Sequence, residues 1–168
     1  MYVALHVFKQ AWKECVPEVD VDGMCKCDIS ALKQFPHWKA VETKIKESDN
    51  WPASKRYYFI AKQICHSSNY GARAGTLQMN TLVKSEGKVA LSKLESEQFL
   101  NTYHTLFPEI RNWHKETTDI LNRYHTLRNL QGYPRTFHNI NVVSEDNLKE
   151  ALAYVPQSTV GCITNKAF

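Results

Sequence analysis

Apolar residues recur at steps of three and four along most of the chain, which is the spacing of one helix face. The pattern predicts helices over residues 3–14, 35–46, 53–68 and 74–86, and further helices that begin after Ser92, near Pro108 and after Ser144. A loop is expected over 17–26. The chain is therefore expected to be mainly α-helical.

Local end signals support these helices. Ser92-Lys93-Leu94-Glu95 has the form of a capping box, and Gly87 suits the residue that stops the helix before it. Pro108 fits a first helical turn, and Ser144 is a good N-cap with acidic residues behind it. Gln131-Gly132-Tyr133-Pro134 is typical of a turn. Alternation over 135–143 predicts a short hairpin, so the fold class is mainly α, an α+β fragment.

The periodicity also predicts which side chains face inward. On the helix over 53–68, the helix that begins after Ser92 and the helix after Ser144, apolar residues fall on one side. The expected inward residues are Tyr58, Ala61, Cys65, Phe99, Tyr103, Leu106, Ile110, Leu148, Ala151, Leu152 and Val155.

Composition adds limits to the function. The chain has 168 residues, 43% of them hydrophobic, which is enough for one globular core. A net charge of +4 permits a nucleic-acid partner without requiring one. Cys25 and Cys27 lack zinc or Cys-x-x-Cys spacing, so we expect reduced thiols and no built-in metal. The stretch from Tyr2 to Phe8 is too short for a membrane span and a poor signal peptide.

The candidate chemistry lies on the helix over 53–68. Lys62, His66 and the Asn69-Tyr70 pair follow one another at about four-residue steps, and Lys55 lies seven residues before Lys62. Such a face offers two ammonium groups, an imidazole and a phenol in a line, which suits a nucleoside triphosphate lying along a helix. The plain alternative is a solvated cationic face with Tyr70 in the core, and periodicity alone favours that alternative.

Three stretches resemble the family A DNA polymerases of phage type. Lys62 followed by Tyr70-Gly71 is similar to motif B on the nucleotide-binding helix of the fingers, although single-subunit RNA polymerases carry a related spacing. The residues Phe107-Pro108-Glu109-Ile110-Arg111-Asn112-Trp113 resemble the segment between fingers helices. The stretch 148–159 resembles a palm helix. The three occur in the family's order, and the resemblance covers residues 56–165.

The resemblance implies roles for individual residues. Lys62, the expected catalytic residue, would contact the triphosphate, His66 would pack on the sugar, and Tyr70 would stack at the base site. The expected nucleotide-binding residues are Lys62, His66, Tyr70, Arg56 and Lys55. The expected DNA-binding residues are Tyr70, Gly71, Arg135, Lys149 and Gln157, with Gln157 at the primer terminus. For Arg135 and Lys149, simple surface charge is an equal alternative, and for Gln157 the alternative is a buried polar side chain that caps local backbone.

One position departs from the family pattern. The family usually has an arginine four residues before the motif B lysine, and Tyr58 stands there in this chain. Arg56 or Lys55 could replace it, or one phosphate contact is lost. Positions 58, 59, 65 and 66 hold no acidic residue, so we expect Lys62 to lack an ion-pair partner on its own helix and to point into an open groove.

The metal-binding carboxylates of the family are not found. Its Asp-x-Ser-x-x-Glu-like motif A and His-Asp-Glu-like motif C do not occur, so Mg²⁺ is expected only in a complete enzyme whose ligands lie outside this chain. The chain is expected to start after motif A, to stop before motif C and to form a single partial domain over 1–168. Within it, 1–50 is poorly defined, 53–130 is fingers-like and 131–168 is a partial palm.

The expected function is thus part of a DNA-directed DNA polymerase, inactive on its own. Its expected partners are deoxynucleoside triphosphates, primer-template DNA and the remaining polymerase parts, without a membrane, in the cytoplasm of a bacterial host or a virus-infected cell. One alternative is a non-catalytic nucleic-acid-binding module that kept the groove and lost the chemistry. Another is a helical domain in which the resemblance serves no function.

Overall fold

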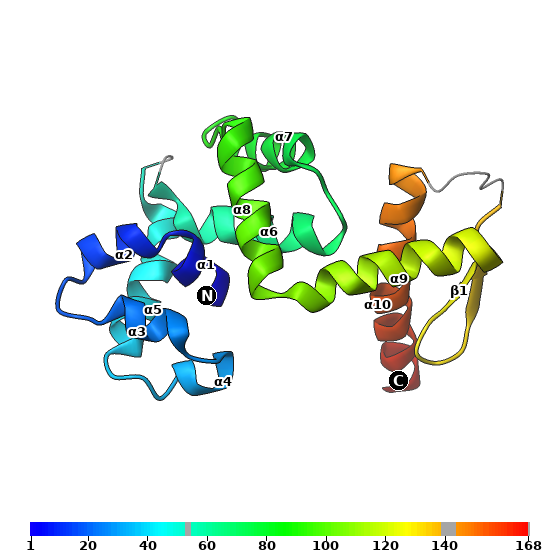
Figure 1. The fold of residues 1–168 in the computed structure, drawn as a ribbon, viewed down its shortest axis with the longest axis horizontal. Helices are drawn as coiled ribbons and strands as arrows, with labels where there is room; N and C mark the ends of the chain where they lie inside the picture. The colour runs from blue at the N-terminus through cyan, green and yellow to red at the C-terminus, as the bar shows by residue number, and fades with distance from the viewer. Residues whose placement is uncertain (53–54, 139–143, 168) are drawn as a thin grey trace. The chain divides into compact units, whose positions relative to one another are not determined.

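The structure, a computed structural model, describes residues 1–52, 55–138 and 144–167. It is mainly helical with one small antiparallel hairpin, which confirms the expected fold class (Figure 1). The elements are α1 (Tyr2–Val7), α2 (Lys9–Cys15), α3 (Val21–Lys26), α4 (Ile29–Leu32), α5 (Trp38–Glu47), the 3₁₀ turn η1 (Ser48–Asn50), α6 (Tyr57–Asn69), α7 (Ala74–Lys84), α8 (Lys93–Leu106), α9 (Pro108–Tyr124), β1 (Thr126–Arg128), β2 (Pro134–Thr136) and α10 (Glu145–Ala167).

The chain divides into two compact units. The first unit comprises residues 1–67 and 73–105, and the second unit comprises residues 68–72 and 106–168. The break at Thr105/Leu106 comes earlier than the change from fingers-like to palm-like segments expected at 131. The assignment of these segments to polymerase subdomains stays a prediction.

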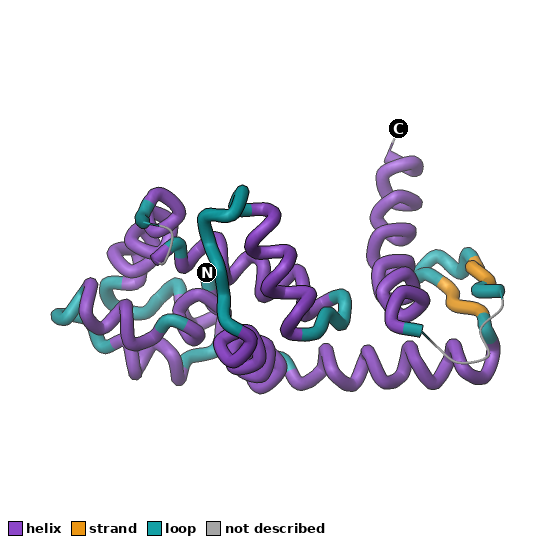
Figure 2. The backbone as a smooth tube through the Cα atoms, turned by 90° about the horizontal axis from the view of Figure 1, so that it is seen from above, coloured by secondary structure: helices purple, strands orange, loops and turns teal. Residues whose placement is uncertain are grey.

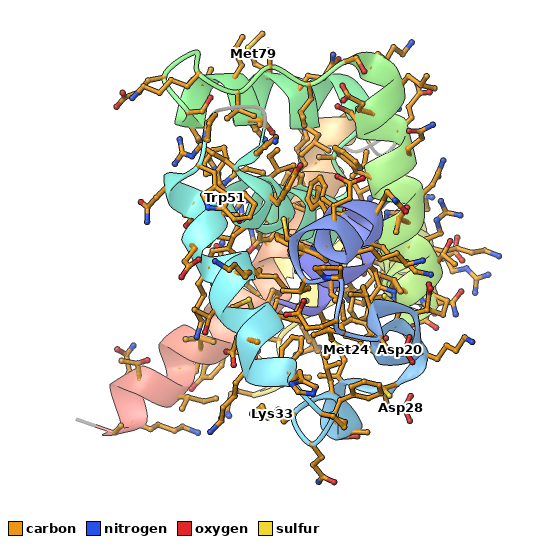
Figure 3. All side chains as sticks on the ribbon, turned by 90° about the vertical axis from the view of Figure 1, so that its left-hand side faces the viewer. Asp20, Met24, Asp28, Lys33, Trp51 and Met79 are labelled. Atoms are coloured by element: carbon orange, nitrogen blue, oxygen red, sulfur yellow. The ribbon has the colours of Figure 1, made fainter. Side chains whose placement is uncertain are left out.

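The N-terminal part contains more helix than its pattern indicates. The loop expected over 17–26 is wrong in its second half, because Asp20 caps α3 by accepting the Gly23 N–H at 2.9 Å. Val21 and Met24 on this helix are buried. Figure 3 labels Asp20 at the start of α3 and Met24 within it. A polar cap followed by buried residues three apart was the available signal.

The single helix expected over 3–14 is also wrong, because the chain breaks into α1 and α2 at Phe8. Phe8 leaves helical geometry at φ −109° and ψ 29°. Its ring stacks on Tyr57 with centroids 4.5 Å apart and meets Phe99 edge-on at 5.4 Å. These contacts come from α6 and α8, so a pattern read along residues 3–14 alone could not indicate them.

An aromatic cluster joins the N-terminal segment to the start of α6. Trp12 is fully buried, its indole N–H donates to the Ala4 carbonyl at 2.8 Å, and its ring meets Tyr57 edge-on at 5.3 Å. Trp51 packs on both rings, at 6.2 Å from Trp12 and 6.1 Å from Tyr57. Each large apolar side chain buried in this way contributes about 1.5–3 kcal/mol relative to exposure. Residues 1–51 therefore form the support on which α6 begins.

The helices α7 and α8 begin and end as their local signals predict. Ser92 and Glu95 form a reciprocal capping box, with the Ser92 N–H donating to Glu95 Oε2 at 2.8 Å and the Glu95 N–H donating to Ser92 Oγ at 3.2 Å. Gly87 has a φ of +80° after α7. Met79, labelled in Figure 3, projects from α7 and is 59% exposed.

The inward face of α8 is rotated from the expected one. Tyr103 is buried as expected, together with Ser96 and Leu100, while Phe99 is only half-buried and contacts Phe8 edge-on. Leu106 and Ile110 are likewise half-buried. On α6 the expected Ala61 is buried, while Tyr58 and Cys65 are half-buried and the neighbouring Ile60 and Ile64 are buried in their place.

In the second unit, α9 leads into the hairpin and α10 returns beside it, as Figures 1 and 2 both show. The strands pair antiparallel, with Leu127 opposite Arg135. The hairpin expected over 135–143 is therefore wrong in its position along the chain. The turn that was expected to precede the hairpin connects its two strands, β1 and β2. Residues 139–143 lie outside the described ones.

The core of the second unit is small. Leu121 of α9, Leu127 of β1, Phe137 after β2 and Ala151 of α10 pack together, and Tyr154 and Val155 cover them. Ser144 caps α10 as expected, accepting the Asn147 N–H at 3.2 Å. Ala151 and Leu152 are fully buried, whereas Leu148 and Val155 are half-buried. Among the described residues, no helix is long and apolar enough to cross a membrane.

Candidate nucleotide-binding site

Lys62 lies in the middle of α6 and is paired with a carboxylate. Its ammonium nitrogen lies 2.9 Å from Asp49 Oδ2, and about half of its side chain (49%) is exposed. The same nitrogen lies 4.0 Å from the centre of the Tyr58 ring, one turn earlier. The partner belongs to η1, not to α6. The expectation of an ammonium pointing freely into an open groove is wrong.

Tyr58 gives Lys62 a cation–π contact at the position where the family usually has an arginine. A cation over an aromatic face at this distance is attracted by the ring quadrupole. The residue that departs from the family pattern thus orients Lys62. It does not supply a second positive charge.

Arg56 and Lys55 come before α6, so helical spacing does not place them on the face of Lys62. Arg56 donates from Nε to the Asp49 carbonyl at 3.0 Å, and its guanidinium carbon lies 4.9 Å from the centre of the Phe59 ring. Lys55 is exposed, and its backbone N–H donates to the Pro52 carbonyl at 2.8 Å. Arg56 is therefore held near Asp49, while Lys55 lies on the surface.

His66 follows Lys62 by one turn of α6 and is exposed. Partial burial, and then the positive charge of Lys84 on α7, lower the pKa of His66 from its usual value of 6.5. The lowered pKa favours the neutral imidazole. A neutral, accessible ring can pack on a sugar without adding charge beside the phosphates.

Tyr70 and Gly71 follow the last residue of α6 and belong to the second unit. Gly71 has a φ of +67°, and a Cβ there would lie 3.2 Å from Leu152 Cδ1. His114 of α9 binds the Asn69 carbonyl through Nε2 at 3.0 Å, and burial lowers the pKa of His114. These contacts fix the turn after α6, and Gly71 has a conformational reason to be glycine. Tyr70 is half-buried.

Arg135 is held by three groups of the second unit. Its guanidinium pairs with Glu150 of α10 at 3.1 Å and lies 5.0 Å from the Phe137 ring centre and 5.7 Å from the Tyr154 ring centre. The Tyr154 hydroxyl in turn donates to the Tyr133 carbonyl at 2.7 Å. Glu150 and the two rings thus orient Arg135 on the hairpin.

The other two expected DNA-binding residues lie on α10. Lys149 is within 3.4 Å of Asp146 Oδ1, one turn earlier on the same helix. Gln157 is exposed, so it is not a buried group that caps backbone, and it follows Pro156. The structure therefore groups Arg135, Lys149 and Gln157 in the second unit and Lys62, Arg56 and His66 in the first.

A cavity of about 740 Å³ in the first unit lies on another side of α6. Phe8, Tyr57, Ile60, Val89 and Phe99 line it with the residues between α7 and α8. Ile60 and Lys62 are about 200° apart around the helix. This cavity is therefore not the groove that the sequence led us to expect beside Lys62.

The described residues do not offer a magnesium site. Among them, no three His, Cys, Asp or Glu side chains come close enough together to hold a metal ion. The carboxylate nearest the candidate site, Asp49, is already engaged by Lys62. The described residues by themselves therefore do not fit Mg²⁺.

Two residues of the site were missed from the sequence, and both lie in η1. Asp49 holds Lys62, and Ser48 accepts the Tyr58 N–H at 3.0 Å. The signal was weak, because Asp49 stands 13 residues before Lys62, beyond the three- and four-residue steps that relate partners on one helix.

Comparisons with family models, with curated proteins and with solved structures find no match to this chain.

Proposed function

We propose that this chain is the nucleotide- and DNA-binding part of a DNA-directed DNA polymerase resembling family A. The observation that supports this most is the position of the motif B-like residues. Lys62 and His66 lie one turn apart on α6 with exposed side chains, and the helix ends at Asn69, directly before Tyr70 and the left-handed Gly71. In this proposal Lys62 binds the triphosphate, His66 packs on the sugar and Tyr70 stacks at the base site.

The charge state of the site suits this role. Lys62 keeps an exposed ammonium whose only recorded charged partner in the described residues is a carboxylate, which a phosphate can replace with charge-assisted hydrogen bonds. Arg56 lies close by through its bond to the Asp49 carbonyl. Partial burial and the charge of Lys84 lower the pKa of His66, which favours the neutral ring.

The second unit supports the DNA part of the proposal. Arg135 projects from the hairpin in an orientation fixed by Glu150 and two rings, and Gln157 is accessible on α10. A guanidinium suits a backbone phosphate, and an amide can both donate to and accept from base edges. We propose that these two residues contact the primer-template.

A binding assay with a matched control tests the nucleotide role. Lys62→Ala should weaken binding of a deoxynucleoside triphosphate about 10- to 150-fold, because it removes a charge-assisted phosphate contact, while affinity for primer-template DNA stays nearly unchanged. Lys93→Ala removes one exposed charge from the start of α8 and should change neither. Equal nucleotide binding by the Lys62 variant and the wild type would contradict the role.

Two further measurements test the DNA role and the expected inactivity. Affinity for primer-template DNA should be weak and should fall as salt rises, because phosphate contacts release counterions. We expect no primer extension by the pure chain with magnesium and all four deoxynucleotides, since the motif A and motif C patterns do not occur. Affinity independent of salt, or template-dependent extension, would count against the proposal.

A further inference from the structure

Asp49 contacts two of the three cations expected at the phosphate end of the site, Lys62 and Arg56. Its carboxylate Oδ2 lies 2.9 Å from the Lys62 ammonium, and its backbone carbonyl accepts Arg56 Nε at 3.0 Å. The two contacts use different parts of one residue. A change confined to the carboxylate therefore alters the environment of Lys62 and leaves the bond to Arg56 in place.

Only one of the two carboxylate oxygens of Asp49, Oδ2, has a partner among the described residues. Its Oδ1 is buried and has no hydrogen-bond partner among the described residues, although the whole side chain is 29% exposed. An unpaired buried carboxylate oxygen is unfavourable, and an ion pair with this exposure stabilises the fold only weakly. The pair can therefore open at little cost.

Lys62 stays oriented when the pair opens. The Tyr58 ring lies beneath the ammonium at 4.0 Å, on the same helix and independent of Asp49. A phosphate that replaces Asp49 would thus meet a cation already held in place. Opening the pair changes the partner of Lys62 more than its position.

We infer that Asp49 is an internal counter-ion that occupies Lys62 in the absence of nucleotide and is displaced when a triphosphate binds. This inference rests on the proposed phosphate contact of Lys62. Asp49 is then a positioning residue that competes with the ligand. Because an anion must displace Asp49 to reach Lys62, Asp49 lowers the affinity of the site for anions.

The test compares binding of inorganic tripolyphosphate to the full chain by calorimetry at low salt. Asp49→Asn keeps the size of the side chain and removes its charge, so affinity should rise about two- to fivefold, the range expected for an exposed ion pair. Glu47→Gln is the matched control, because Glu47 is two residues away and pairs with Lys44 at 3.0 Å. Glu47→Gln should raise the affinity for tripolyphosphate by less than half as much as Asp49→Asn does.

A double variant shows whether Asp49 acts through Lys62. In the Lys62→Ala background, adding Asp49→Asn should leave the weak affinity for tripolyphosphate unchanged. If Asp49→Asn acted through the structure and not through Lys62, the affinity would change in this background as well. Asp49→Glu keeps the charge and should bind tripolyphosphate like the wild type. An equal gain in both backgrounds, or no gain from Asp49→Asn, overturns the inference.

A measurement on the wild type removes the dependence on variants that fold poorly. The carboxyl ¹³C resonance of Asp49 should move on saturation with tripolyphosphate, while that of Glu47 stays in place; an unmoved Asp49 resonance overturns the inference. If Lys62→Ala weakens tripolyphosphate binding but Asp49→Asn does not change it, the inference about Asp49 is wrong and the proposed phosphate contact of Lys62 is not contradicted. No detectable binding by the wild type or by Asp49→Asn rejects the proposed phosphate contact as well.

Discussion

The hydroxyl of Ser48 accepts the backbone N–H of Tyr58 at 3.0 Å, across ten residues of sequence. The same hydroxyl donates to the Ile45 carbonyl at 2.6 Å, and the side chain is fully buried. One small residue therefore connects the end of α5 to the first turn of α6. It satisfies one of the N–H groups that a helix start leaves without a partner inside the helix.

Replacing Ser48 by alanine should destabilise the first unit by about 1–3 kcal/mol, because both buried partners would lose their hydrogen bond. Chemical denaturation followed by circular dichroism measures the difference. Ser30→Ala, at an exposed serine of α4, should change stability by less than about 0.5 kcal/mol. Equal effects of the two substitutions would show that the Ser48 bonds do not contribute.

Alanine at Gly71 should cost about 1–2 kcal/mol of stability, because an alanine at φ +67° is strained and its Cβ would crowd Leu152. Gly75 offers the opposite control. It lies in the first turn of α7 with nothing within 4 Å of an added Cβ, so Gly75→Ala should be neutral or stabilising by up to about 1 kcal/mol. Denaturant midpoints of the two variants should shift in opposite directions or differ clearly in size.

The capping box should make stability depend on acid pH. The hydrogen bonds from Ser92 to Glu95 lower the pKa of Glu95 below its usual 4.5. As the pH falls, Glu95 is therefore protonated in the unfolded chain before it is protonated in the folded chain. The contribution of the Glu95 carboxylate to stability is complete above about pH 4.5 and disappears as the pH falls through the lower pKa of the folded state.

The stability difference between wild type and Glu95→Gln should therefore shrink between pH 6 and pH 3. Because Glu95 is mostly exposed, we expect a difference of only about 0.5 kcal/mol at neutral pH. Glu97→Gln, whose partner Lys93 lies 4.0 Å away, should show a smaller change. A constant difference across this range would mean that the Glu95 charge does not matter.

Asp22 should titrate in the folded chain at a pKa of about 2. Hydrogen bonds from Lys13 and Lys9 hold this pKa below the usual 3.8, with Lys13 at 2.6 Å. Carboxyl ¹³C shifts followed by NMR against pH give the value. Lys13→Gln should raise the pKa more than Lys9→Gln does, and a pKa near 3.8 in the wild type would show that the two pairs are absent in solution.

Local signals were enough to predict several helix ends from α7 onward. The Ser92 and Ser144 caps, the Gly87 stop and the start at Pro108 depend on neighbours within four residues, and each is found as expected. These features need no knowledge of the rest of the fold, because a cap satisfies backbone groups in its own turn.

The errors have distant causes. At the break, the Phe8 ring contacts Tyr57 of α6 and Phe99 of α8, which are far away in sequence. The site shows the same limit. The sequence identified Lys62 and His66 on one helix face, but the partner of Lys62 comes from η1, where only tertiary packing brings Asp49 close. Helical periodicity carries no information on such pairs.

The aromatic cluster around Trp12 also decides what the intrinsic fluorescence of this protein reports. Three of the four tryptophans, Trp12, Trp38 and Trp51, belong to the first unit, and only Trp113 belongs to the second. Trp12 and Trp51 lie near each other and near Tyr57, so excitation of that tyrosine can transfer to them. Tryptophan emission therefore reports mainly on residues 1–51, which support α6. In a Trp113→Phe variant the emission would report on the first unit alone.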